Sequence, residues 1–195
     1  DPIAVFADTG HEHPLTYKYL DYLRSVLGVE IRTVRADFTK EIDHRREYVA
    51  EKWPVKGVPQ ALVDRAVELL HPTGVPFLDM FLWKGRFPSS ASQFCTGELK
   101  VVPITLQVVL PLLSAGREVW SGQGVRADES PNRAKLTAQE WTDPGITAYR
   151  PILTWTAAQV FDYARRKGIK PNPLYLQGMS RVGCMPCVNC RKDEL

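Results

Sequence analysis

The first fifty residues alternate between short apolar runs and stretches of helical periodicity, and this alternation constrains the fold more than any other feature. Residues 3–8 form an apolar run that ends in a turn, and residues 14–28 repeat apolar side chains at helical spacing. A second strand is expected over 30–36 and a second helix over 38–52. Strand, helix, strand, helix is the order of a parallel sheet covered by helices. We therefore expect an α/β fold, a parallel sheet with helices on both faces.

The remainder is less regular. The pattern predicts helices over 60–70, 96–113 and 156–167, and a strand over 118–125. Pro103 is expected to bend the second of these helices or to lie in its first turns. The tail over 169–195 is rich in Pro, Gly and Cys, so it is expected to be irregular. We expect one domain over residues 1–195, with this Cys-rich tail packed on it.

The balance of charges excludes few functions. The formal net charge is +3, with 44% hydrophobic and 24% charged residues, which is typical of a soluble globular chain. Such a mild excess permits an anionic small ligand and does not by itself indicate nucleic-acid binding. An uninterrupted apolar run of about 18 residues is missing, so no membrane span is expected. Without a recognisable signal peptide, a cytoplasmic location is expected.

Three cysteines crowd into seven residues. Cys184, Cys187 and Cys190 are separated by two residues each, and Cys95 lies far away in sequence. Three convergent thiolates with one distant cysteine are the ligand pattern of a [4Fe–4S] cluster. A four-cysteine zinc site is the main alternative, and unligated thiols are the other. Little besides a metal would order so irregular a tail.

Three segments could bind an anion. Gly124, Arg126 and Arg133 lie in a loop after the predicted strand over 118–125, where glycine admits a phosphate and arginine binds oxyanions in fork geometry. Asp8-Thr9-Gly10 ends the first strand, and open α/β sheets bind ligands at such ends. Lys100 lies about one helical turn after Cys95. Taken alone, the glycine-rich loop and the Asp8–Gly10 segment are more typical of plain turns, and Lys100 could simply face solvent.

Taken together and in order, these segments resemble the phosphoadenosine phosphosulfate (PAPS) reductase family. The resemblance rests on five segments, VFADTG, CTGELK, GVR with a following Glu-Ser and Arg, YRPILTW, and NPLY with GCMPC, at 5–10, 95–100, 124–133, 149–155 and 172–187. It implies the adenine-nucleotide α-hydrolase-like fold and assigns no catalytic residue. The residues it implies in nucleotide or anion binding are Asp8, Thr9, Gly10, Lys100, Gly124, Arg126, Glu129, Ser130 and Arg133. The four cysteines resemble those of the cluster-bearing branch of the family.

The sequence departs from the family pattern in three ways. The phosphate loop that should precede residue 3 is missing, and so is the redox cysteine of a C-terminal Glu-Cys-Gly segment, so we expect a chain truncated at both ends. Cys95-Thr96 also replaces a tandem Cys-Cys, with Cys190 supplying the remaining ligand. That rearranged set resembles phage- and prophage-type members and the ATP pyrophosphatases of DNA sulfur modification.

The resemblance implies three alternative functions. The first is binding of an adenine (sulfo)nucleotide in reductive sulfur transfer, with thioredoxin or glutaredoxin as thiol donor. The second is an ATP pyrophosphatase that activates a nucleic acid or another acceptor for sulfur insertion. The third is a non-catalytic nucleotide-binding, iron–sulfur module. Self-association into a homo-oligomer is compatible with each of them.

Overall fold

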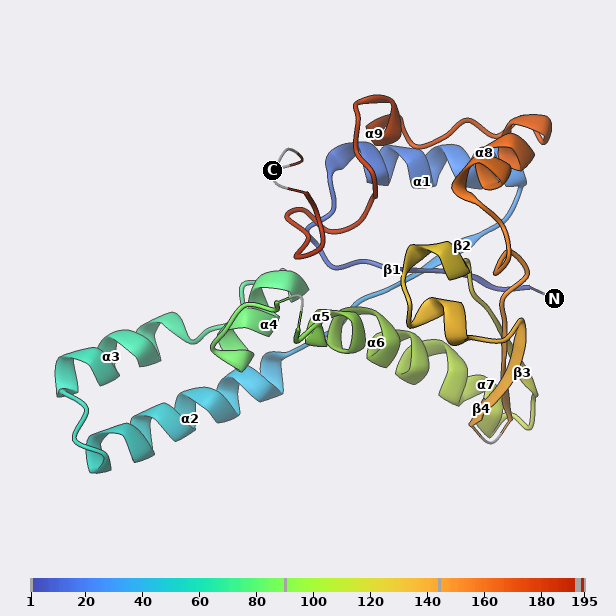
Figure 1. Cartoon of the computed structure of the whole chain (residues 1–195). Helices are drawn as coiled ribbons and strands as arrows, with labels where there is room; N and C mark the ends of the chain where they lie inside the picture. The colour runs from blue at the N-terminus through green and yellow to red at the C-terminus, as the bar shows by residue number, and fades with distance from the viewer. Residues whose placement is uncertain (1, 90, 144, 192–193, 195) are drawn as a thin grey trace.

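The computed structural model describes residues 2–89, 91–143, 145–191 and 194 of the chain, and it shows a mixed α/β architecture (Figure 1). The strands are β1 (Ala4–Ala7), β2 (Ile31–Val34), β3 (Val119–Gly122), β4 (Gln139–Asp143) and β5 (Ile146–Tyr149). The separate helices are α1 (Pro14–Leu27), α2 (Thr39–Val55), α3 (Gln60–Leu69), α4 (Pro76–Lys84), α8 (Ala157–Arg166) and α9 (Pro173–Leu176).

A further helical run covers Phe94–Ser114 and alternates between α-helix and π-helix. It consists of α5 (Phe94–Thr96), η1 (Gly97–Val101), α6 (Val102–Ile104), η2 (Thr105–Val109) and α7 (Leu110–Ser114). Pro103 and Pro111 each remove a backbone N–H, and local shifts in hydrogen-bond spacing accommodate such interruptions. The expected helix over 96–113 is therefore confirmed, without being a regular α-helix.

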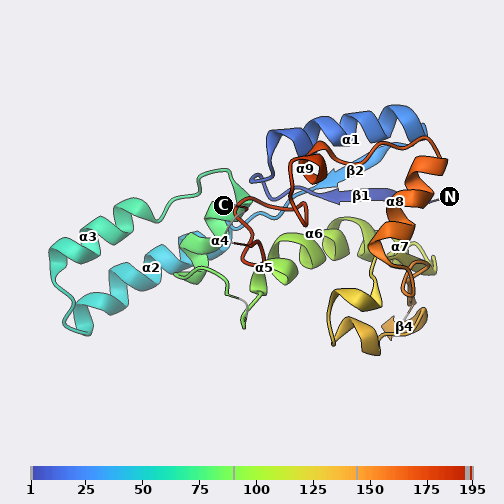
Figure 2. The same cartoon turned by 45° about the horizontal axis from the view of Figure 1, so that its top comes forward.

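The strands form two small sheets. β1 pairs with β2 in parallel, and β5 lies between β3, which is parallel to it, and β4, which is antiparallel. Figure 2 shows α1 on one face of the β1–β2 pair and the run from α5 to α7 on the other. The expected α/β class with helices on both faces is confirmed, whereas the described strands do not join into one continuous sheet.

The N-terminal unit follows directly from its sequence. The His13 ring accepts a hydrogen bond from the Leu15 N–H at 3.1 Å and so caps α1, which starts at Pro14. Gly28 ends the helix in the left-handed conformation, at φ 62°. Thus the expected helix over 14–28 is confirmed, with its stop at the predicted glycine.

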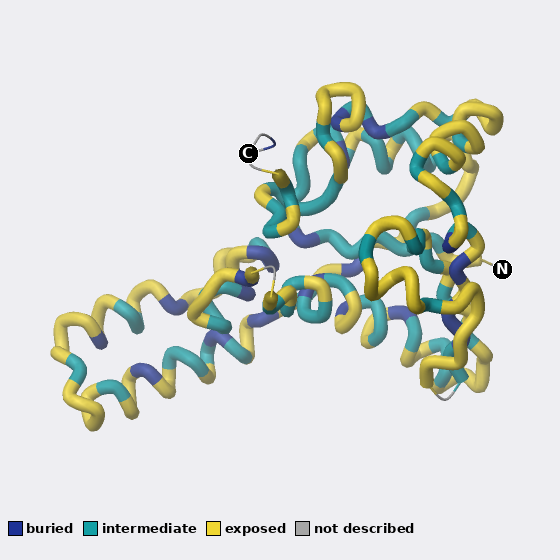
Figure 3. The backbone as a smooth tube through the Cα atoms, viewed as in Figure 1, coloured by how far each residue is buried: buried dark blue, intermediate teal, exposed yellow. Residues whose placement is uncertain are grey.

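An antiparallel pair of helices, α2 and α3, extends away from the sheets (Figure 1). Buried residues line the sides on which these helices face each other (Figure 3). This core continues from Ile42, Val49 and Val63 into Met80 of α4 and Leu99 of the helical run. The main hydrophobic core therefore lies between helices. The expected loop over 54–59 is wrong at its start, because α2 continues to Val55.

The strands β4 and β5 and the short helix α9 were not expected from the sequence. All five residues of β4 are exposed, so its sequence has no apolar alternation that would indicate a strand. β4 pairs with β5 across a tight turn that contains Gly145, where φ is 80°. The short helix α9 begins where the Asn172 side chain accepts a hydrogen bond from the Leu174 N–H at 3.0 Å. Apart from α9, the tail has the irregular backbone that its composition predicts; its last residues, 192–193 and 195, lie outside the described part.

Helical segments lie on either side of β4 and β5 along the chain. The short 3₁₀ turns η3 (Ala127–Glu129) and η4 (Arg133–Lys135) follow β3. Helix α8 starts with a capping box, in which Thr156 and Gln159 exchange side-chain-to-backbone hydrogen bonds. The helix expected over 156–167 is therefore confirmed.

Candidate functional site

The turn that follows β1 is fixed by the carboxylate of Asp8. One oxygen accepts hydrogen bonds from the Gly10 N–H and from the Tyr17 hydroxyl, both at 2.8 Å. The other oxygen lies 3.4 Å from Nε of Arg35, which follows β2. The turn thus sits at the carboxyl ends of two parallel strands, where α/β proteins bind their ligands.

Thr9 is fully buried and ties this turn to Glu12. Its hydroxyl donates to Oε1 of Glu12 at 2.7 Å, and Tyr17 also approaches Oε2 of Glu12 at 3.0 Å. Burial, followed by the hydrogen bonds to Asp8 and Glu12, raises the pKa of Tyr17 above its usual value. Tyr17 therefore stays a neutral donor between two carboxylates, and the turn is held from both sides.

Gly10 occupies a position that a side chain cannot enter easily. Its φ is 72°, and a Cβ there would lie 2.9 Å from Nη2 of Arg35, 3.1 Å from Cδ of Pro76 and 3.2 Å from Cγ1 of Val75. Left-handed backbone costs a non-glycine residue roughly 1–2 kcal/mol before any close contact is counted. The close packing of Arg35, Val75 and Pro76 against this turn therefore depends on a glycine at position 10.

We expect Gly10→Ala to lower the free energy of unfolding by about 2 kcal/mol, because strain and crowding add. Gly28→Ala is the matched control: its φ is 62°, yet a Cβ there meets nothing within 4 Å, so only the backbone strain remains. Urea unfolding of the two variants measures the difference. Equal losses would show that the space around Gly10 is not restrictive.

The cysteine tail docks directly on this turn. The Met185 N–H donates to the His11 carbonyl at 2.7 Å, and the His11 ring contacts the Met185 carbonyl. Glu12 and Cys184 form an isolated antiparallel bridge, and the His11 ring stacks on Phe77 at 4.5 Å between centroids. Figures 1 and 2 both show the tail between the end of β1 and helix α4. The tail therefore packs on the domain, beside the Asp8–Gly10 turn.

Cys95 meets the tail from the other side. Cys95 and Cys184 both pack against the core cluster. Two residues before Cys95, the side-chain amide of Gln93 donates a hydrogen bond to the side-chain oxygen of Asn189 in the tail, at 3.2 Å. Burial raises the pKa of the Cys184 thiol to about 11, and Lys100 acts in the opposite direction. Charges on Cys187, Glu12 and Cys95 raise it further. Cys184 thus lies within electrostatic reach of two other cysteines and of Lys100.

Cys184, Cys187 and Cys190 also line one small cavity of about 20 Å³. Their donor chemistry suits iron–sulfur or zinc binding. However, within residues 2–89, 91–143, 145–191 and 194, no group of three or more His, Cys, Asp or Glu side chains is positioned to hold a metal ion. The structure therefore brings the cysteine-bearing segments together without a formed ligand set, and the metal site stays a prediction.

Glu194 holds the far end of the tail. Its carboxylate accepts hydrogen bonds from the Ser180 N–H at 2.6 Å and from the Arg191 N–H at 2.9 Å. These bonds favour the charged form, and they lower the pKa of Glu194 from 4.5 to about 2. The carboxylate closes a loop around the segment that carries Cys184, Cys187 and Cys190.

Because the folded-state pKa of Glu194 is lowered, its contribution to tail closure is complete above pH 4.5 and is lost as the pH falls toward 2. We expect the Ser180 amide to exchange with solvent faster across that interval. Glu194→Gln removes the titrating group. In this variant, the exchange rate of the Ser180 amide, divided by the intrinsic rate of an unprotected amide at each pH, should stay constant between pH 4.5 and 2. An identical pH profile in wild type and variant would contradict this assignment.

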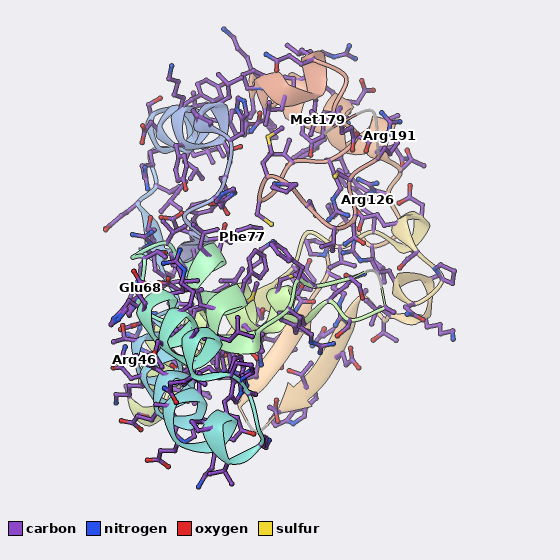
Figure 4. All side chains as sticks on the ribbon, turned by 90° about the vertical axis from the view of Figure 1, so that its left-hand side faces the viewer. Arg46, Glu68, Phe77, Arg126, Met179 and Arg191 are labelled. Atoms are coloured by element: carbon purple, nitrogen blue, oxygen red, sulfur yellow. The ribbon has the colours of Figure 1, made fainter. Side chains whose placement is uncertain are left out.

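The arginine loop after β3 forms a cluster of its own. Arg126 pairs with Asp128 at 3.0 Å and with Glu129 at 3.6 Å, and Glu129 also pairs with Arg133. The Ser130 hydroxyl accepts from the Arg133 N–H at 3.3 Å. In Figure 4, Arg126 lies apart from Phe77, against which the His11 ring of the first turn stacks. An anion entering this loop would compete with the loop's own carboxylates for both guanidinium groups.

The structure thus joins some predicted residues and leaves others separate. Asp8, Thr9 and Gly10 lie beside the cysteine tail, together with Lys100. Among the described residues, no hydrogen bond or ion pair links Arg126 or Arg133 to that cluster. Gly124 has open space around it, since a Cβ on this glycine would meet only Cδ1 of Ile152, at 4.0 Å. The anion-binding role of all nine residues remains a prediction.

Four contributors to the site were not predicted from the sequence. Glu12, Tyr17 and Arg35 fix the first turn, and His11 receives the tail. The local pattern around His11 is typical of a solvent-exposed loop, and nothing in it indicates a tail 174 residues away. Only Tyr17 has a usable pattern, because a tyrosine on the first turn of α1 can reach back to the strand end.

The fold and this site define an α/β protein with a firmly held turn at the carboxyl ends of two parallel strands, the place where α/β proteins of this class bind their ligands. Residues 1–190 match the family model of the phosphoadenosine phosphosulfate reductase domain. This chain therefore belongs to the PAPS reductase family, which is one of soluble enzymes.

Individual proteins of known sequence or structure are also similar to this chain. A protein of Escherichia phage 186, named "Uncharacterized 37.8 kDa protein in gpa 5'region", is 54% identical over 98% of this chain and 60% of its own length. An adenosine 5'-phosphosulfate reductase of Burkholderia cepacia is 37% identical over 95% of this chain and 60% of its length. The fold is similar to that of a PAPS reductase from Candida auris, solved as a phosphate complex, with a TM-score of 0.51 and 19% identity over 94% of this chain and 69% of that one. The chain thus spans 60% of the length of these two curated relatives.

Proposed function

We propose that this chain is the nucleotide-binding part of a cytoplasmic enzyme that binds an adenylyl sulfonucleotide and acts in reductive sulfur transfer. The observation that carries the proposal is the match of residues 1–190 to the PAPS reductase domain. The 37% identity with the Burkholderia cepacia adenosine 5'-phosphosulfate reductase supports the sulfonucleotide as substrate class. The Asp8–Gly10 turn supports it further, because its place at the end of β1 suits a nucleotide.

The candidate site residues are proposed to have different roles in binding the anionic part of the nucleotide. Arg126 and Arg133 are proposed to bind the phosphate and sulfate oxygens, since guanidinium groups bind oxyanions in paired hydrogen bonds. Gly124 allows backbone approach, and Glu129 and Ser130 hold the two arginines in place. Lys100, near Cys184, is proposed to neutralise the anion on the cysteine side.

The four cysteines are proposed to hold a [4Fe–4S] cluster, with zinc as the alternative. The support is the approach of Cys184 to Cys95 and Cys187, and the small cavity that Cys190 shares with Cys184 and Cys187. Bound there, a cluster would order the tail and add a fixed charge beside the turn. We assign no chemical step to it, because the described thiols form no ligand set.

The reaction proposed for the whole enzyme starts with attack of a thiolate on the sulfate sulfur. This step forms a thiosulfonate and releases the nucleotide, and a dithiol donor such as thioredoxin or glutaredoxin then releases sulfite and is oxidised to its disulfide. None of the four cysteines is proposed as the attacking thiol, because all four are assigned to the metal.

The test is sulfite release from adenosine phosphosulfate and from PAPS by the polypeptide expressed from its complete natural reading frame, with a dithiol donor present. The proposal expects donor-dependent sulfite. Absence of sulfite from both substrates would contradict it.

The rearranged cysteine pattern favours a second candidate, an ATP pyrophosphatase that activates a nucleic acid or another acceptor. In that case the same protein should release pyrophosphate from ATP only when an acceptor is added. The same two assays separate a third outcome, a non-catalytic nucleotide-binding module, which would bind nucleotide and yield neither product.

A further inference from the structure

Arg150 is a buried side chain to which the proposed function gives no role. It follows β5 directly, and among residues 2–89, 91–143, 145–191 and 194 it is the one buried arginine or lysine, at 6% exposure. Removing a charged side chain from water is unfavourable unless hydrogen bonds and an opposite charge offset the loss. The acceptors around this guanidinium group therefore show what its burial achieves.

Two of these acceptors lie at the ends of the arginine loop, residues 123–137. Nε of Arg150 donates to the side-chain oxygen of Gln123 at 3.0 Å, at the point where the chain leaves β3. Nη1 donates to the Thr137 carbonyl at 2.9 Å, just before β4 begins. The same nitrogen pairs with Oε2 of Glu140 in β4, also at 2.9 Å. One planar group thus joins both ends of the loop that carries the two candidate anion-binding arginines.

Backbone hydrogen bonds hold the loop to the same segment after β5. The Arg150 N–H donates to the Ala138 carbonyl at 2.8 Å, beside the second end of the loop. Within the loop, the Ala127 N–H donates to the carbonyl of buried Leu153 at 2.8 Å. Ala127 follows Arg126 in the chain, so this bond fixes the backbone from which the Arg126 side chain projects.

The ion pairs inside the loop cannot provide this attachment. Glu129 pairs with Arg126 and with Arg133, and these pairs join parts of the loop only to one another. The side chain of Arg150 instead joins the loop to the end of β5. A binding group that is already held in place loses less conformational entropy when its ligand arrives, so it binds more tightly.

We propose that Arg150 is a positioning residue for anion binding. By holding both ends of the arginine loop against the end of β5, it determines how tightly Arg126 and Arg133 bind the phosphate and sulfate of a sulfonucleotide. Because Arg150 is buried, it acts through the loop and does not touch the ligand. This inference rests on the proposed function, and it adds a residue to which that proposal assigns no part.

Calorimetric titration with adenosine phosphosulfate tests the proposal in variants of the polypeptide from the complete natural reading frame. Arg150→Met keeps an apolar stem and removes every donor, so it should weaken binding roughly tenfold, because the loop must then be ordered by the ligand. Arg150→Lys keeps a positive charge but lacks the planar fork, so its affinity should lie within about threefold of that of Arg150→Met. Wild-type affinity in Arg150→Lys would show that charge alone suffices, and would overturn the clamp.

Val49→Ala controls for a general loss of stability. Val49 is buried in α2, in the core between helices, and its truncation removes packing there without changing the loop. Its affinity for adenosine phosphosulfate should stay within about twofold of the wild-type value, because distant sites act independently. Equal losses of affinity in Val49→Ala and Arg150→Met would show that binding follows stability, and would contradict a positioning role.

Amide hydrogen exchange measures the loop itself, without a ligand. In Arg150→Met the Ala127 amide should exchange at least roughly tenfold faster than in the wild type, whereas the Ile42 amide in α2 should keep its rate. An unchanged Ala127 rate, or wild-type affinity in Arg150→Met, would overturn this inference and leave the proposed function intact. Failure of the wild-type protein to bind adenosine phosphosulfate would instead overturn the proposed function, and this inference with it.

Discussion

Replacing Arg126 with alanine should weaken sulfonucleotide binding roughly 10- to 100-fold, which corresponds to the loss of about 1.5–3 kcal/mol from a charge-assisted hydrogen bond. The side chain is partly buried, at 21% exposure, and Asp128 and Glu129 already align it. A ligand anion would therefore meet a positioned guanidinium group. Calorimetric titration with adenosine phosphosulfate measures the change.

The control for this variant must remove the same charge elsewhere. Arg165 is suitable, since it is 79% exposed on α8 and pairs with Asp162 in the same helix. Arg165→Ala should leave affinity within about twofold, because a screened surface charge contributes little. Equal losses in the two variants would indicate a nonspecific effect of net charge, and would remove Arg126 from the site.

Cys184→Ser should abolish most metal binding, leaving below about one tenth of the wild-type iron or zinc per chain, because each thiolate of a four-ligand site is needed. Cys184 is chosen because it packs against the same core cluster as Cys95 and lines the same small cavity as Cys187 and Cys190. Its backbone bridge to Glu12 does not use the thiol, so docking of the tail should survive. Metal and sulfide are measured on anaerobically purified protein.

Val188→Ala provides the comparison, since it alters a residue between Cys187 and Cys190 that carries no ligand atom. It should retain the wild-type metal content. If Cys184→Ser retains it too, Cys184 is not a ligand. If neither variant nor wild type contains metal, the cysteines are unligated thiols, and the tail is held by contacts such as those with His11, Glu12 and Gln93 and by Glu194.

Much of the N-terminal fold could be predicted from sequence because its determinants are local. Apolar runs, the proline at the start of α1 and the glycine at its end lie within a few residues of the structure they cause. β4 could not be predicted, because its exposed residues have no apolar alternation and its pairing depends on β5. The π-helical turns likewise depend on how Pro103 and Pro111 are accommodated.

The candidate site could be predicted in pieces rather than as an assembly. The cysteine spacing indicates convergence in the tail, and the structure does bring Cys95 toward Cys184. What the sequence could not show is the contact of the tail with His11 and Glu12, which joins residues about 170 positions apart in the chain. Nor could it show that Glu129 holds Arg126 and Arg133 within their own loop, because this depends on the conformation between β3 and β5.

Recognition of the sulfate of a sulfonucleotide, rather than of its nucleoside monophosphate part alone, separates the proposed function from general nucleotide binding. The most direct test is a calorimetric comparison of adenosine phosphosulfate with AMP, using the polypeptide from the complete natural reading frame. Adenosine phosphosulfate should bind on the order of ten times more tightly than AMP, since the sulfate adds at least one charge-assisted contact. Equal affinity for the two ligands, or tighter binding of AMP, would contradict it.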